Sequence, residues 1–277
     1  MASTSPKPRR RNGAVAPARA KAQAAARIVE ADPARRHAAV SLADRAYERL
    51  EELLVCCELQ PGRFMATHEL QAMVGFGRTP VLQAVTRLAA DTLVAVTPRH
   101  GLRIAPIDLG RDRVLLRLRR DMERFVIRLA TERSGASQRN QMLHLQRQLV
   151  EHREGITLQQ FNQVDRRIDQ LVLAAAGEPF VESTLRPLHT IFRRIGWIFH
   201  MRTPQGVDLA GTVDAHIAVL DAVAGGRAEA AIAASDRLID YMESMFEVLE
   251  REVSPALLDS SLGTLDDTFA PGSIALA

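Results

Sequence analysis

The chain has 277 residues, 47% apolar and 25% charged, which predicts mostly globular structure with length for one large domain or two modest ones. Its 36 Lys and Arg against 33 Asp and Glu give a net charge of +3, too small for wholesale coating of a nucleic acid. The only cysteines, Cys56 and Cys57, are adjacent and cannot staple the fold, so a reducing, cytoplasmic compartment is expected. No uninterrupted apolar run reaches the roughly 18 residues of a membrane span.

The two ends of the chain read as tails. The first 36 residues are rich in Ala, Pro, Arg and Lys and contain no Leu, Phe or Trp. Such a segment cannot bury enough apolar surface to offset the entropy of ordering it, so residues 1–38 are expected to be a disordered basic tail. This tail either adds nonspecific phosphate contacts to DNA or is a solvated extension. Residues 254–277 are likewise expected to be a flexible C-terminal tail.

Residues 39–106 have the pattern of a winged helix-turn-helix. Apolar residues recur at helical spacing after Ser41 and again after Thr67, and Gly75-Phe76-Gly77 supplies a tight turn. A third helix is predicted from Arg78 or Thr79, with Pro80 in its first turn, where a missing amide hydrogen costs nothing. Residues 93–104 then alternate about a turn and predict a two-stranded wing.

The surfaces of this domain point to DNA as the partner. A helix placed like the third one presents its N-terminal residues to a major groove. At the tip of the wing, Arg99 and His100 stand beside Gly101, which lets backbone approach a phosphate or the minor groove closely.

The segments LQPGRF, HELQAMVGFGRTPVLQAVTRL and TPRHGLRI resemble the N-terminal domain of the GntR family of bacterial transcription regulators. The resemblance implies DNA contacts from Arg78, Thr79, His100 and Gly101, and it places His68 where relatives often carry a phosphate-contacting residue. Together with the exposed pattern of the third helix, the predicted DNA-binding set is His68, Arg78, Thr79, Gln83, Arg87, Arg99, His100 and Gly101. Leu82-Gln83 replaces the family's usual Arg-Glu, so base reading should differ, at about 1–3 kcal/mol per good contact.

Residues 107–253 predict an all-helical bundle, so the fold class is mainly α. Leu115, Leu118, Met122, Phe125 and Leu129 repeat at three and four residues. Similar stripes recur near residues 138–153, 157–176, 180–201, 209–224 and 227–251, which indicates about six helices. Bundles of this kind can hold a ligand between facing helices, so inward-pointing polar residues are the candidates for a site.

Three polar residues stand out within these stripes. Asp165 and Asp169 lie one turn apart on one helix, where like charges repel, so they face either open solvent or a shared cation. His216, between Val213 and Leu220, should face inward, either as a satisfied core residue or as a metal ligand.

The segments RRDME, DRRIDQLVLAAAGEPF and AHIAVLDAVAGGRAEAAIAA resemble the FCD effector domain that follows the DNA-binding domain in the FadR-type branch. That resemblance implies a small carboxylate effector, held by an arginine and a metal. Three of the four metal-binding positions that the resemblance implies are Asp165, Asp169 and His216 here. The fourth is Leu238. The implied effector set is Arg119, Glu123, Asp165, Asp169, Arg193 and His216. The set leaves open a weakened divalent metal site completed by waters, or a metal-free pocket in which Arg119 binds the anion with Arg193 or Arg194.

These observations predict a cytoplasmic, homodimeric transcription regulator that binds double-stranded operator DNA. Its helical domain would bind an effector, expected to be an organic acid, and occupancy would reposition the DNA-binding domains. The competing hypothesis is a metal-dependent helical enzyme using Asp165, Asp169 and His216, with the winged helix as a docking module. A nonspecific architectural DNA binder is a third reading.

Overall fold

A computed structural model describes Met1 and residues 41–97, 101–202 and 209–260 of the chain. The predicted tail at residues 1–38 lies outside the described residues, Met1 excepted, and so do Arg99 and His100 of the wing. No helix among the described segments is long and apolar enough to cross a membrane.

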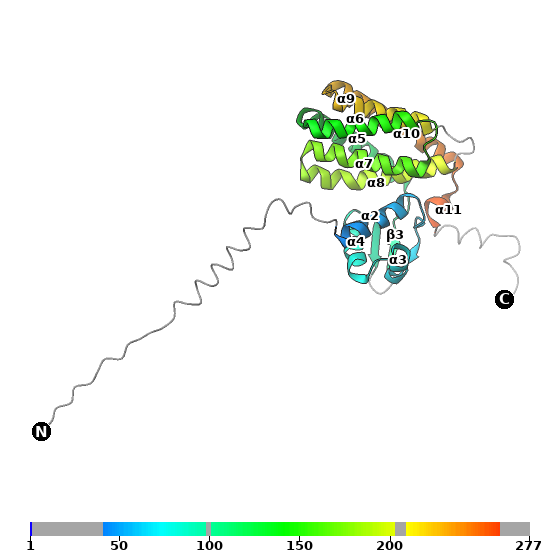
Figure 1. The fold of residues 1–277 in the computed structure, drawn as a ribbon. Coiled ribbons are helices and arrows are strands. Elements are labelled where there is room, and N and C mark those ends of the chain that lie inside the picture. Colours follow the sequence, from blue (N-terminus) through cyan, green and yellow to red (C-terminus); the bar gives the residue numbers. More distant parts are fainter. Residues whose placement is uncertain (2–40, 98–100, 203–208, 261–277) are drawn as a thin grey trace. The chain divides into compact units, whose positions relative to one another are not determined.

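The N-terminal part of the described chain is a winged helix (Figure 1). Its elements are α2 (Leu42–Val55), β1 (Phe64–Met65), α3 (Thr67–Val74), α4 (Arg78–Ala90), β2 (Val94–Thr97) and β3 (Gly101–Ile104). The strands form an antiparallel sheet in the order β1-β3-β2, with Val94 opposite Ile104 and Phe64 opposite Arg103. The predicted hairpin is therefore present, and β1 adds a third strand that is too short to show an alternating pattern.

Local signals set the ends of the helix-turn-helix. The Glu69 carboxylate accepts a hydrogen bond from the Ala66 backbone N–H at 2.8 Å, which satisfies a donor at the start of α3. Gly75 ends that helix in the left-handed region at φ +71°, as the Gly-Phe-Gly turn predicts. Val81, Val85 and Leu88 then form the buried stripe of α4, as expected from their spacing. This packing leaves the opposite face of α4 exposed to solvent.

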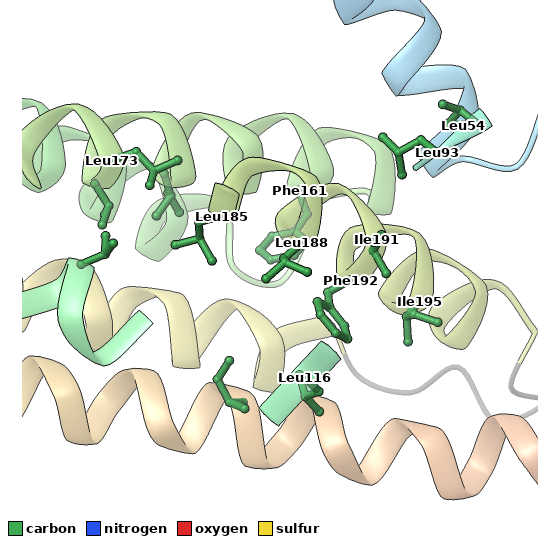
Figure 2. Packing of buried hydrophobic residues seen from close by; sticks show 14 of the residues in the cluster. Leu54, Leu93, Leu116, Phe161, Leu173, Leu185, Leu188, Ile191, Phe192 and Ile195 are labelled. Carbon is green, nitrogen blue, oxygen red and sulfur yellow. The ribbon is translucent and has the colours of Figure 1, made fainter. Parts of the chain in front are cut away.

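The C-terminal part is a bundle of long helices that run alongside one another in Figure 1. They are α5 (Leu109–Arg133), α6 (Ala136–His152), α7 (Leu158–Ala176), α8 (Pro179–Arg202), α9 (Leu209–Ala224) and α10 (Ala228–Glu252). Figure 2 shows Phe161 of α7 with Leu188 and Phe192 of α8 pointing into the space among the helices. Phe192 is fully buried and meets Phe246 of α10 edge-on, at 6.5 Å between ring centroids. The helical segments predicted from sequence are confirmed to within a few residues at their ends.

The expectation of a flexible tail from Ser254 is wrong for its first residues. Pro255–Leu258 form a short helix, α11, and residues up to Ser260 contact the winged helix and the linker after it. The Leu258 carbonyl accepts a hydrogen bond from Ile107 N at 2.8 Å, and the Asp259 carboxylate pairs with Arg103 of β3 at 2.9 Å. These bonds and the half-buried Leu257 and Leu258 hold the segment in place.

Candidate functional sites in the winged helix and the bundle

The outward face of α4 carries the predicted reading residues. Arg78, Thr79 and Gln83 are exposed, and so are Leu82 and Thr86 between and after them. Arg78, Thr79 and Gln83 occupy the N-terminal half of the helix, the part that a recognition helix inserts into a major groove. His68 is exposed on the preceding helix, α3.

Arg87 is placed differently from the other predicted contacts. Its guanidinium forms an ion pair with Asp44 of α2 at 2.7 Å and lies 4.2 Å from the centroid of the Tyr47 ring. These contacts hold α4 against α2 and occupy the side chain within the domain. Arg87 therefore contributes to packing within the domain, while its side chain stays 37% exposed and its predicted contact with DNA remains untested.

Gly101 is required by packing inside the wing. It has φ +90°, and a Cβ at this position would lie 2.5 Å from the Met65 carbonyl oxygen of β1. The close approach expected at this glycine is thus to the protein's own backbone. Its predicted contact with DNA remains untested.

A cavity of about 50 Å³ lies among the bundle helices. Polar and charged groups form part of its wall, and apolar residues, several of them aromatic or sulfur-containing, form the rest. The residues lining it are Arg119, Leu158, Phe161, Asn162, Asp165, Phe192, Arg193, Gly196, Trp197, His200, Thr212, His216, Leu238, Tyr241, Met242 and Met245. Of the six predicted effector residues, Arg119, Asp165, Arg193 and His216 line this cavity.

Glu123 lies behind the cavity wall and contacts both Arg119 and His189. Its Oε1 atom accepts from Arg119 Nε at 3.2 Å and lies 2.7 Å from His189 Nε2. Burial would raise the pKa of Glu123, but His189 and then Arg119 outweigh it and lower that pKa to about 2. Glu123 therefore stays ionised and orients Arg119, which itself faces the cavity.

Asp165 and His216 form a buried ion pair on the cavity wall. His216 Nε2 lies 2.9 Å from the Asp165 carboxylate, and His216 Nδ1 lies 2.7 Å from the Thr212 carbonyl oxygen. Because both partners only accept hydrogen bonds, both ring nitrogens must carry protons, which makes the ring an imidazolium. Burial opposes that charge, yet Asp165 outweighs it and raises the pKa of His216. Burial would likewise raise the pKa of Asp165, but His216 brings it to about 2.

Asp169 turns away from this pair. Its Oδ2 atom lies 3.4 Å from His189 Nδ1 and 3.9 Å from Arg193 Nε. Burial raises the pKa of Asp169 to about 6, and the neighbouring Asp165 adds to the rise although His189 and Arg193 oppose it. Asp169 therefore faces neither open solvent nor a cation shared with Asp165, because side chains of the protein itself face the two carboxylates.

The residues present do not fit the implied metal site. Asp169 faces His189 and Arg193 instead of joining Asp165 and His216, and the fourth position is the hydrocarbon side chain of Leu238. Across the residues that the structure describes, no group of three His, Cys, Asp or Glu side chains could hold a metal ion. Arg194, the alternative anion ligand, instead donates to the Ala105 carbonyl at 2.7 Å.

Several site residues were not singled out from the sequence. His189 bridges Glu123 and Asp169, while Asn162, Trp197, His200 and Thr212 line the cavity. Glu51 of α2 is also buried, with its side chain 3% exposed. One signal was available for Glu51, because it lies four residues after Tyr47 and three before Leu54 and so shares their buried face.

Comparisons with known proteins bear on both parts of the chain. Residues 42–104 match the family described as bacterial regulatory proteins, gntR family, and residues 114–241 match the FCD domain. The chain belongs to the GntR family of regulators. It is therefore a DNA-binding transcription regulator with an FCD domain, and the enzyme hypothesis finds no support among these matches.

Two GntR-type relatives illustrate the extent of the similarity. The HTH-type transcriptional repressor RspR of Escherichia coli is 26% identical over 164 residues, which is 57% of this chain and 71% of RspR. An HTH-type regulator in an unstable DNA locus of Streptomyces ambofaciens is 35% identical over 65 residues. That second match covers 24% of this chain and 28% of the relative.

Solved structures share the fold at low identity. Escherichia coli McbR/YncC matches 77% of this chain and 100% of its own, with a TM-score of 0.67 and 17% identity. A GntR-type regulator from Rhodococcus sp. RHA1 matches 74% of this chain and 96% of its own, with a TM-score of 0.55 and 16% identity. At these identities the likeness concerns the fold alone.

Proposed function

We propose that this GntR-family regulator binds a small organic anion in the bundle cavity and that occupancy controls operator binding in the cytoplasm. The observation that carries the proposal is the pair of buried arginines on the cavity wall. Arg119 and Arg193 are each less than 10% exposed. Arg193 Nε is buried without a hydrogen-bond partner among the described residues, which is costly unless a ligand or water supplies one.

The remaining wall narrows the chemistry of this anion. Guanidinium groups bind carboxylates through paired hydrogen bonds, and Asn162 and Thr212 add neutral polar groups. Phe161 and Trp197 offer apolar contact on the same cavity. The small volume favours a carboxylate of a few carbons. Because the residues do not fit a metal, the anion would be held by these side chains directly.

A thermal-shift screen tests this proposal. Full-length protein is measured with mono- and dicarboxylates of two to six carbons, and with inorganic phosphate as a non-carboxylate anion. We expect a carboxylate to raise the Tm of the wild type and of Arg120→Gln, and to lose that effect in Arg119→Gln. Arg120 is the matched control, because it pairs with Asp240 on the outside of the bundle at 2.7 Å. Stabilisation by no acid, or equal stabilisation of both variants, would refute carboxylate binding at this cavity.

DNA reading is assigned to the exposed N-terminal half of α4. Arg78, Thr79 and Gln83 lie there together, which supports direct contact with base edges or phosphates. Because Leu82-Gln83 stands where the resemblance leads one to expect Arg-Glu, we infer that the operator differs from those of typical relatives. Selection of bound sequences from a random DNA library, repeated with Gln83→Ala, tests this. An unchanged preference would exclude Gln83 from base reading.

We also infer that the protein acts as a homodimer on a palindromic operator. Val114, Leu118 and Phe125 on α5 are large apolar residues that are 63%, 49% and 52% exposed. They lie four and seven residues apart, so they form one stripe along the helix, and a second copy would cover it. Light scattering after gel filtration should give a dimer for the wild type and a monomer for Leu118→Glu with Phe125→Glu. A monomeric wild type would contradict the inference.

A further inference from the structure

Arg193 of α8 lies between two cavities. On one side it lines the bundle cavity described above. On the other it lines a second cavity of about 240 Å³ beside α2, together with Glu51 and Arg166. Asn162 is the other residue common to both. Arg193 and Asn162 therefore border both the proposed effector site and the cavity beside α2.

The contacts of Glu51 show what Arg193 does on the α2 side. Glu51 Oε1 accepts a hydrogen bond from Arg193 Nη2 at 2.9 Å and another from the Thr190 hydroxyl. Its second oxygen, Oε2, pairs with Arg166 Nη2 of α7 at 3.1 Å. Burial would raise the pKa of Glu51, but Arg193 and Arg166 outweigh it and lower that pKa, so the group is ionised. A buried carboxylate on α2 is thus held by two arginines of the bundle.

The guanidinium of Arg193 is only partly used by these contacts. Its Nη2 atom faces Glu51, while its Nε atom lies 3.9 Å from Asp169 and has no hydrogen-bond partner among the described residues. A carboxylate in the bundle cavity would offer the guanidinium of Arg193 a second, better-placed hydrogen-bond partner. If Arg193 turned toward it, Glu51 would keep Arg166 and Thr190, so no buried charge would be left unpaired.

We propose that Arg193 is a relay for which Glu51 of α2 and an anionic effector in the bundle cavity compete. Occupancy of the cavity then loosens the attachment of α2 to α8 and changes how the winged helix is held. This inference rests on the proposed anion binding. Beyond that binding, it names Arg193 as the residue that couples the cavity to the DNA-binding domain. It also gives the direction of the coupling.

Reciprocity gives a measurable consequence. If the effector weakens the contact of Glu51 with Arg193, then removing that contact must strengthen effector binding by the same factor. Glu51 does not line the bundle cavity, so a change there affects ligand affinity only through Arg193. Trp197 lines the cavity and is the single tryptophan of the chain, so its fluorescence reports occupancy.

The experiment titrates full-length protein with succinate, a dicarboxylate, and follows Trp197 fluorescence. We expect Glu51→Gln to bind succinate about tenfold more tightly than the wild type, within the range typical of coupled sites. Glu52→Gln is the matched control, because Glu52 pairs with Arg49 on the same helix at 2.7 Å. Its affinity for succinate should equal that of the wild type.

Arg166→Gln provides a variant of opposite sign. Without Arg166, Glu51 depends on Arg193 alone and holds it more strongly, so succinate should bind more weakly. Amide hydrogen exchange in α2 provides a second readout. Exchange should rise in Glu51→Gln without ligand, and succinate should raise it in the wild type and in Glu52→Gln but no further in Glu51→Gln.

The outcomes separate the relay from the binding proposal. Equal or weaker succinate binding by Glu51→Gln would overturn the relay while leaving anion binding intact. Absence of any succinate signal in the wild type and in Glu51→Gln would count against the proposed anion site. In that case the relay would be overturned if amide hydrogen exchange in α2 of ligand-free Glu51→Gln were the same as in the ligand-free wild type.

Discussion

Replacing Asp169 with Asn removes a buried carboxylate and nearly preserves the shape of the side chain. In the fold, burial and the neighbouring Asp165 raise the pKa of Asp169 from 3.8 to about 6. A carboxyl group that binds its proton more tightly in the fold destabilises the fold once it ionises. The penalty is absent below about pH 4, develops between pH 4 and 6, and is complete above pH 7.

The size of this effect follows from the shift in pKa. About two units correspond to about 3 kcal/mol, at about 1.4 kcal/mol per unit. The free energy of unfolding of Asp169→Asn should therefore exceed that of the wild type by about 3 kcal/mol at pH 8, which corresponds to a Tm about 6–12 °C higher. At pH 5 the difference should be about half as large. Urea and thermal unfolding of the full chain at both pH values measure it. Glu123 and Glu51 still face His189 and Arg193 in the variant, so neither side chain is left without a partner.

Asp165→Asn is the matched control one helical turn earlier. Asp165 has its pKa lowered to about 2 by His216, so the same substitution should cost about 2 kcal/mol at pH 7. Destabilisation by Asp169→Asn at pH 8, or a gain that does not shrink on acidification, would refute the assignment of Asp169 as a buried carboxylate with a raised pKa.

Three further predictions concern the reading helix, the wing and the metal positions. Arg78→Ala should weaken binding to a selected operator about 5–150-fold at fixed salt, whereas Arg87→Ala should mainly lower Tm; equal losses of DNA affinity would contradict the different placement of the two side chains. Gly101→Ala should lower the urea unfolding free energy by at least about 2 kcal/mol because of its positive φ and the nearby carbonyl, and a neutral result would argue against that geometry. Asp169→His with Leu238→His should bind no more zinc or nickel per chain than the wild type by elemental analysis, because residue 169 faces His189 and Arg193, and a gain of about one ion per chain would show that these positions do converge.

The helices were predictable because their signals are local. The segment at residues 157–176 was expected from its apolar stripe, and Leu158–Ala176 is observed. Thr157 accepts a hydrogen bond from Gln160 N at 3.2 Å, and Gly177 ends the helix at φ +63°, so both boundaries are encoded by neighbouring residues. Strand β1 was missed because it has two residues and gains its identity only by pairing with β3.

The site was predictable in its composition and less so in its pairings. Periodicity placed His216 inward, and the family resemblance picked out Arg119 and Asp165 of the same cavity wall. The side chains that face Asp169 are His189 and Arg193 of α8, twenty or more residues further along the chain. Tertiary packing decides that they meet it. For the same reason the ion pair of Arg87 with Asp44 of α2 was not expected from the sequence.

The bond between Leu258 and Ile107 joins the two ends of the bundle segment beside the winged helix. The chain enters the bundle at Ile107 and leaves it at Leu258, and these two residues are joined by a hydrogen bond of 2.8 Å. Arg103 of β3 gains its carboxylate partner, Asp259, only when the chain returns. During synthesis this ion pair of the wing can therefore form only after the whole bundle has been made.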